Sequence, residues 1–209
     1  MISRHYWDDE HTIETIGRAI QDGKLVISTT DTVIGLLAGA TKKGKNSLDL
    51  AKNRVEKPYL LLVVDIEKAL GYVHPDERVQ IENIGRVCWP GPVTLVARAA
   101  PGLPDYLLSS EGTIALRVPA HSGLQRLLGH VDVLFSTSAN TAGAPVPELL
   151  KDLDSSFLKK AVAIVADRKE DKKTVPSTII NCSTDPVSIV RKGAFAVELL
   201  KPIIGYIPR

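Results

Sequence analysis

The chain has 209 residues, a length that fits one substantial domain and leaves no room for a second large one. Its 44% hydrophobic and 24% charged residues are typical of a globular protein and exclude a disordered or fibrous one. The net charge of +2 excludes a strong overall attraction to nucleic acid or membrane surfaces. Because no stretch approaches the roughly 20 apolar residues of a membrane span, we expect a cytoplasmic protein without a membrane partner.

The first fifth of the chain predicts a helix followed by two strands around a polar loop. Isoleucines recur at helical spacing within residues 8–21, with an aspartate at the start to cap the helix and Gly23 to close it. Apolar runs at residues 25–27 and 33–37 predict strands on either side of Ser28-Thr29-Thr30-Asp31-Thr32. A buried strand therefore delivers hydroxyl groups to a loop.

The rest of the chain continues to alternate between helices and strands. We expect a helix at residues 47–52, a strand at 59–64, helical stretches before and after 74–75, strands at 93–97 and 113–118, a helix from Leu124, and strands at 133–135, 162–166, 178–181 and 188–190. The late strands lie too close together for a helical crossover between each pair, which favours a mixed sheet. The sequence therefore predicts an α/β fold with an open twisted mixed sheet and flanking helices.

Three cations, Lys52, Arg54 and Lys57, lie close together at the end of a predicted helix. Together they would neutralise a polyphosphate, and an arginine can grip phosphate oxygens through its planar fork. A solvated helix face is the other interpretation of such a charge run. The three residues are therefore candidates for phosphate binding, with the second interpretation left open.

Polar groups also accompany two of the predicted strands. Ser138 and Asn140 point the same way along an extended segment and can offer a hydroxyl and an amide to one ligand, although such residues also form turns. Arg117 can bind a carboxylate bidentately, with Thr113 on the same face of its strand, and a structural ion pair is the alternative. The sequence has no P-loop, dinucleotide glycine pattern or histidine-based metal site. These residues alone predict an α/β domain with an anion cleft.

Seven stretches, in matching order over residues 13–194, resemble the YrdC-like family of threonylcarbamoyl-AMP synthases. They are Ser28-Thr29-Thr30-Asp31-Thr32-Val33 with Gly35; Lys52-Asn53-Arg54 with Lys57; Trp89-Pro90-Gly91-Pro92-Val93-Thr94-Leu95; Thr113-Ile114-Ala115-Leu116-Arg117-Val118-Pro119; Ser136-Thr137-Ser138-Ala139-Asn140 with Gly143; Pro176-Ser177-Thr178; and Val190-Arg191-Lys192-Gly193-Ala194. So many ordered matches exclude chance agreement.

The resemblance implies that ATP and L-threonine bind in a concave basic cleft. The positions that correspond to nucleotide contacts are Lys52, Arg54, Lys57, Thr113, Ser138, Asn140 and Arg191. The positions that correspond to threonine contacts are Thr30, Arg117, Ser138 and Ser177. The Trp-Pro-Gly-Pro stretch offers few free polar groups, so we expect it to have a mainly structural role. No protein metal site is implied, because Mg²⁺ would be held mainly by substrate oxygens and water.

The chain departs from the usual family pattern near several of these positions. Thr29 and Val55 stand where proline is common, Leu62 stands where some members have histidine, and Glu148 stands where a hydroxyl residue is common. These changes affect the surroundings of the site and leave the Lys-x-Arg and Ser-x-Asn pairs intact. We expect them to alter substrate affinity or geometry.

The resemblance is to the short, single-domain type within the family. It implies one domain over residues 1–209, with a core at about 9–194 and a short tail at 195–209. The implied reaction forms threonylcarbamoyl-AMP and pyrophosphate from L-threonine, bicarbonate or CO₂, and ATP, for threonylcarbamoyladenosine modification of tRNA. Downstream transferase proteins and weak RNA binding are implied partners. The alternatives are a non-catalytic RNA-binding module of the same fold and an enzyme that forms a carbamoyl adenylate.

Overall fold

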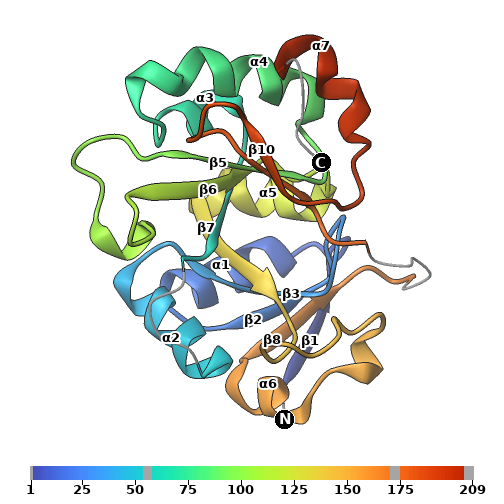
Figure 1. Ribbon diagram of the computed structural model, residues 1–209. Coiled ribbons are helices and arrows are strands. Elements are labelled where there is room, and N and C mark those ends of the chain that lie inside the picture. Colours follow the sequence, from blue (N-terminus) through green and yellow to red (C-terminus); the bar gives the residue numbers. More distant parts are fainter. Residues whose placement is uncertain (1, 54–57, 170–174, 205–209) are drawn as a thin grey trace. The chain divides into compact units, whose positions relative to one another are not determined.

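The computed structural model describes residues 2–53, 58–169 and 175–204 (Figure 1). These residues group into two compact units, each built from two separate stretches of the chain. Unit 1 contains residues 2–53 and 121–169, and unit 2 contains residues 58–120 and 175–204. The expectation of one domain over residues 1–209 stays a prediction.

The described residues of unit 1 form five strands of mixed direction. In spatial order they are β1 (Ser3–Tyr6), β8 (Ala163–Ala166), β2 (Val26–Ser28), β3 (Gly35–Gly39) and β7 (Val133–Ser138). Strand β8 runs parallel to both β1 and β2, whereas β3 is antiparallel to both β2 and β7. It follows that β1, β8, β2 and β7 all run in one direction, so their carboxyl ends share one edge of the sheet.

Helices α1 (Thr12–Gln21), α2 (Lys42–Lys52), α5 (Ser122–Val131) and α6 (Ser155–Lys160) complete unit 1, with a short 3₁₀ turn at Leu150–Asp152. Helix α1 packs on α5, and α2 packs on α6. Side chains of Thr41, His121 and Asp154 accept backbone N–H bonds at the starts of α2, α5 and α6, which satisfies donors that a helix start leaves unpaired.

Two details of unit 1 differ from expectation. Helix α1 begins at Thr12 rather than near residue 8, because the Asp9 carboxylate accepts the Tyr6 N–H at 3.3 Å instead of capping the helix. Helix α2 begins at Lys42, five residues earlier than expected, because Thr41 caps it there. The end of α1 was predicted correctly, since Gly23 adopts φ +74 just beyond it.

Unit 2 also contains a mixed sheet. Its strands in spatial order are β4 (Leu60–Val63), β6 (Thr113–Arg117), β5 (Val93–Arg98), β9 (Thr178–Asn181) and β10 (Ser188–Arg191). Strand β5 is antiparallel to β6 and parallel to β9, and β10 is antiparallel to β9. The carboxyl end of β6 therefore meets the amino ends of β5 and β9 at one edge of this sheet.

The helical elements of unit 2 are α3 (Ile66–Leu70), α4 (Arg78–Cys88) and α7 (Lys201–Ile204), with 3₁₀ turns at Pro75–Glu77, Asp105–Leu107 and Val197–Leu200. Helix α4 packs on α3 and on the C-terminal helical turns. With a mixed sheet and flanking helices in each unit, the predicted α/β class is confirmed. None of the helices in the described ranges combines the length and the apolar character needed to cross a membrane.

Candidate functional site

The predicted residues of unit 1 lie at the shared carboxyl edge of its sheet. Ser28, Gly35 and Ser138 are neighbours in one cross-strand row, because Ser28 pairs with Gly35 and Gly35 pairs with Ser138. Thr30 follows Ser28 in the loop between β2 and β3, and Asn140 follows Ser138 beyond β7. Ligands of open α/β sheets commonly bind beyond the carboxyl ends of strands.

Lys52, at the end of α2, joins Ser138 and Asn140 in one hydrogen-bonded group. Its side chain is buried, and its Nζ donates to the Ser138 carbonyl at 2.8 Å and to the Asn140 carbonyl. The Ser138 hydroxyl donates to Asn140 Oδ1 at 2.5 Å, which ties the two side chains together. Three predicted nucleotide contacts therefore lie together. Arg54 and Lys57, also predicted, lie outside the described residues.

A pocket of about 530 Å³ adjoins this group in unit 1. Its lining includes Asn140 and the following segment through Glu148, together with Asp152 and Asp154. Asn140 Nδ2 donates to the Ala144 carbonyl at 2.6 Å and so shapes the first turn of the lining. Glu148, one of the departures from the family pattern, thus belongs to the lining of the same pocket as Asn140.

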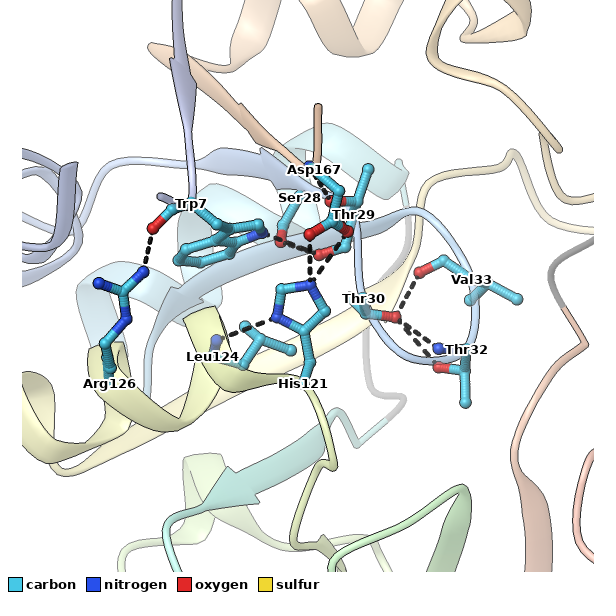
Figure 2. Close-up of polar contacts among 10 residues, drawn as sticks. All are labelled: Trp7, Ser28, Thr29, Thr30, Thr32, Val33, His121, Leu124, Arg126 and Asp167. Atoms are coloured by element: carbon cyan, nitrogen blue, oxygen red, sulfur yellow. Dashed lines mark hydrogen bonds and ion pairs between the residues drawn. The ribbon is translucent and has the colours of Figure 1, made fainter. Parts of the chain in front are cut away.

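The Thr30 hydroxyl organises its own loop. Its Oγ1 donates to the Val33 carbonyl at 2.8 Å and accepts the Thr32 N–H at 3.0 Å, as Figure 2 shows. Such a hydroxyl-backbone turn fixes the loop from within. A Cβ on the neighbouring Gly35 would lie 3.2 Å from the Thr137 carbonyl oxygen, tight enough to force a shift.

In unit 2, two predicted arginines lie near Ser177. Arg191 donates from Nε and Nη2 to the Ser177 carbonyl at 3.0 and 2.9 Å, and from Nη2 to its hydroxyl at 3.1 Å. Arg117 is buried, and its Nε donates to the Gly91 carbonyl at 3.0 Å. Burial lowers the pKa of Arg191, and the positive charge of Arg117 lowers it further. Two guanidinium groups that feel each other's charge favour an anion, such as a carboxylate or phosphate.

Thr94 belongs to the same edge and was not singled out in the sequence. Its Oγ1 lies 3.0 Å from the Ser177 Oγ, and both side chains are buried. The signal available was a hydroxyl residue in an otherwise apolar strand directly after Trp89–Pro92. Strand topology explains the contact, because β5 and β9 begin at the same edge.

Thr113 lies apart from these residues. It occupies the first position of β6 and pairs with Arg98, whereas Arg117 ends the strand. At about 3.3 Å per residue the two are separated by ~13 Å along the strand. The Thr113 hydroxyl instead lies 2.8 Å from Ser109 Oγ. The structure therefore does not bring Thr113 together with Arg117, Ser177 or Arg191.

The Trp89-Pro90-Gly91-Pro92 stretch contributes mainly through its backbone. Trp89 Nε1 donates to the Val93 carbonyl at 2.7 Å, and the Gly91 N–H donates to Val118 at 2.9 Å. The Gly91 carbonyl accepts from Arg117, and a Cβ at Gly91 would lie 2.5 Å from the Cys88 carbonyl. This stretch therefore orients Arg117. Leu62, a departure from the family pattern, pairs directly with Arg117 in β4.

A metal site and a reactive cysteine are two further chemical possibilities. Within the described parts of the chain, no three His, Cys, Asp or Glu side chains are grouped to hold a metal ion. Cys88 and Cys182 are buried free thiols, and burial raises the pKa of each to about 12. Neither thiol is poised as a nucleophile, and both serve as small core residues.

Comparisons with known proteins show the family to which the chain belongs. The family model for Sua5, YciO and YrdC proteins, described as telomere recombination, matches residues 18–193. A threonylcarbamoyl-AMP synthase of Pyrococcus abyssi is 28% identical over 95% of this chain, which spans 59% of that protein. One from Idiomarina loihiensis is 31% identical over 81% of this chain and 92% of its own length.

A solved structure extends the likeness to three dimensions. The crystal structure of P. abyssi Sua5 complexed with L-threonine matches all of this chain with a TM-score of 0.85 and 27% identity, over 62% of that chain. Escherichia coli YciO, at 21% identity and a TM-score of 0.75, shares the fold. The ordered motifs, the fold and these matches together place the chain in the Sua5/YciO/YrdC family.

Proposed function

We propose that the chain is an L-threonylcarbamoyladenylate synthase, which forms threonylcarbamoyl-AMP and pyrophosphate from L-threonine, bicarbonate or CO₂, and ATP. The observation that carries the proposal is the Arg191 guanidinium bonded to the Ser177 hydroxyl, with the buried Arg117 close enough for its charge to lower the pKa of Arg191. This arrangement suits an amino-acid carboxylate or a phosphate, and the similar P. abyssi protein was crystallised with L-threonine.

In the proposed reaction the threonine amine and CO₂ form a carbamate, whose oxygen attacks the α-phosphorus of ATP and expels pyrophosphate. Nucleotidyl transfer of this kind depends on positioning and charge neutralisation more than on a protein nucleophile. Arg117 and Ser177 bind the threonine carboxylate, while Arg54, Lys57 and Arg191 neutralise phosphates. Lys52 holds Ser138 and Asn140 in place for the nucleotide.

Mg²⁺ is part of the proposal as a companion of ATP. When bound, it would help to neutralise the phosphate charge, and phosphate oxygens and water would supply most of its ligands. The residues of this chain need only accommodate the charge of the complex. Bicarbonate as the carbon source, transferase proteins that consume the product, weak RNA contacts and a cytoplasmic location belong to the same proposal.

The test is incubation of the protein with ATP, L-threonine and bicarbonate, followed by mass spectrometry for threonylcarbamoyl-AMP and an assay of pyrophosphate. We expect both products, and we expect neither when L-threonine is omitted. The Arg54→Ala variant should strongly reduce product formation, and near-normal turnover would refute the role of Arg54. The absence of product from the unmodified protein would refute the proposal.

The two alternatives give different results in the same assays. A carbamoyl-adenylate-forming enzyme would release pyrophosphate with carbamoyl phosphate and without L-threonine. An RNA-binding module would consume no ATP, and its RNA affinity would fall steeply with salt. No observation on the described residues favours either over the synthase.

A further inference from the structure

We propose that Asp167 is a positioning residue of the site. Together with His121 and Trp7 it fixes Thr29, and so holds the loop of residues 29–33, which carries Thr30, in the geometry that L-threonine requires. The inference rests on the proposed function for its substrate. The contacts that carry it all lie within unit 1, and Figure 2 draws those among Trp7, Thr29, His121 and Asp167.

Trp7, Asp167 and Thr29 occupy equivalent places at three neighbouring strand ends. Each directly follows the last residue of its strand, and β1, β8 and β2 are adjacent and parallel. Thr29 Oγ1 donates to Asp167 Oδ2 at 3.0 Å and accepts the Asp167 N–H at 2.9 Å. Trp7 Nε1 donates to the Thr29 carbonyl at 3.4 Å. Thr29 is therefore held through both its side chain and its backbone.

His121 fixes the carboxylate on its other side. Its Nδ1 accepts the Leu124 N–H at 3.2 Å, which assigns the remaining ring proton to Nε2. That Nε2–H lies 3.1 and 3.2 Å from the two Asp167 oxygens, and the His121 side chain is only 9% exposed. Since both ring nitrogens are engaged, His121 has no free nitrogen with which to accept a substrate proton. It acts on Asp167 and through it on Thr29.

Contacts with neighbouring residues hold Asp167 and Trp7 in position. The Trp7 and His121 rings pack with their centroids 5.4 Å apart, and the Trp7 carbonyl accepts from Arg126 on α5. Arg168, the residue after Asp167, donates from Nε to the Asp8 carboxylate at 2.8 Å. The residues that follow β1 and β8 are thus bound to each other as well as to the loop.

The link from Thr29 to Thr30 is short and stiff. Thr30 closes its own turn through Val33 and Thr32, so residues 30–33 form a unit whose placement depends on the residues that anchor it. Proline, common at position 29 in the family, fixes the backbone through its ring. In this chain the threonine hydroxyl and the Asp167 carboxylate supply the anchor instead. The polar cluster thus takes the place of the proline ring beside a candidate substrate loop.

The experiment compares Thr29→Val, which has nearly the same shape but no hydroxyl, with Thr29→Ser, which keeps it. Thr15→Val, at an exposed position of helix α1, is the matched control for the same exchange of atoms. We expect Thr29→Val to raise the KM for L-threonine about tenfold, the factor for loss of a hydrogen bond to a charged group, with the KM for ATP nearly unchanged. Thr29→Ser should recover most of the affinity, and Asp167→Asn should resemble Thr29→Val.

An unchanged KM for L-threonine in Thr29→Val, or equal increases in both KM values, would overturn the proposal. So would a Thr29→Ser variant as impaired as Thr29→Val.

Amide hydrogen exchange separates this inference from the proposed function, because it needs no turnover. In the unmodified protein the Asp167 and Thr32 amides should be protected, and Thr29→Val should lose protection at both. Loss at Asp167 with full protection at Thr32 would show that the tie does not hold the loop. Suppose that the unmodified protein makes no threonylcarbamoyl-AMP, while Thr29→Val loses amide protection at both Asp167 and Thr32. That result would refute the proposed function and still support the role of Asp167 in positioning the loop.

Discussion

The two units position their candidate residues by different means. In unit 1, Thr30 and Asn140 bond to backbone carbonyls of their own loops, and Lys52 bonds to the Ser138 and Asn140 carbonyls, so these residues shape the edge of the sheet. In unit 2, the arginines concentrate positive charge near Ser177. The residues of unit 1 therefore provide geometry, and those of unit 2 provide charge. Substitutions in unit 1 should therefore affect stability and positioning, and those in unit 2 should affect anion binding.

The largest expected effect is that of Arg117→Lys. Lysine keeps the charge but loses the planar fork, which binds the Gly91 carbonyl and, in the proposed function, the carboxylate of L-threonine. We expect kcat/KM for L-threonine to fall by about 100-fold, with little change in thermal stability. Arg98→Lys is the matched control. Arg98, in the neighbouring strand β5, forms an ion pair with Glu77 of the 3₁₀ turn, so this variant should retain activity. Normal turnover by Arg117→Lys would show that positive charge without the planar fork is sufficient at this position.

Lys52→Met should lower stability, whereas Arg117→Lys should chiefly lower activity. Removing the ammonium leaves buried carbonyls of Ser138 and Asn140 without this donor, at a cost of about 2 kcal/mol in the free energy of unfolding, measured in urea. Lys160→Met removes contacts to the Leu50 and Ala51 carbonyls in the last turn of the same helix, without touching Ser138 or Asn140, and should lower stability less and leave ATP affinity intact. Equal effects of the two variants would show that Lys52 has no special part in the site.

Gly123→Ala tests the packing that supports the Thr29 anchor. A Cβ at Gly123 would lie 2.4 Å from the Trp7 ring, so the ring must shift, and we expect a loss of about 1–3 kcal/mol. Gly129→Ala on the same helix meets nothing within 4 Å and should be neutral or stabilising by up to ~1 kcal/mol. Thermal unfolding measures both. A Gly123→Ala protein as stable as Gly129→Ala would contradict the close contact.

The smallest expected effect concerns the two thiols of unit 2. Because burial raises each pKa to about 12, about one thiol in ten thousand is ionised at pH 8 in the folded protein. Alkylation by iodoacetamide should therefore be very slow until urea unfolds the chain, and raising the pH toward 12 should accelerate it. Rapid modification of the native protein, followed by mass spectrometry, would show that the interior of unit 2 opens readily.

Much of this organisation could be predicted, because local pattern decides most of the elements. Strands such as β4 and β6 are apolar runs between clear breaks, and their prediction was confirmed. Strand β1 was missed, because Ser3–Tyr6 is polar and becomes a strand only by pairing with β8 far along the chain. The early start of α2 was missed because its first turn contains lysines rather than an apolar stripe.

The site shows the same limit. The pairing of Ser138 with Asn140 follows from strand alternation, and Arg117 follows from its place at a strand end. No spacing in the sequence connects Thr29, His121 and Asp167, because their contact depends on which strands become neighbours. For Thr113, the alternation of side chains correctly predicts the same face of the strand as Arg117. It does not bring the two residues together, because they lie at opposite ends of β6.

The strand order of unit 1 has a consequence for synthesis on the ribosome. Strand β8 lies between β1 and β2, although both of these emerge long before it. Until residues 163–166 leave the exit tunnel, β1 has no parallel neighbour and β2 keeps one edge unpaired. A nascent chain that has been synthesised to residue 120 therefore still lacks β8, which the sheet of unit 1 needs between β1 and β2. Translation pauses before β8 should prolong exposure of that edge to chaperones.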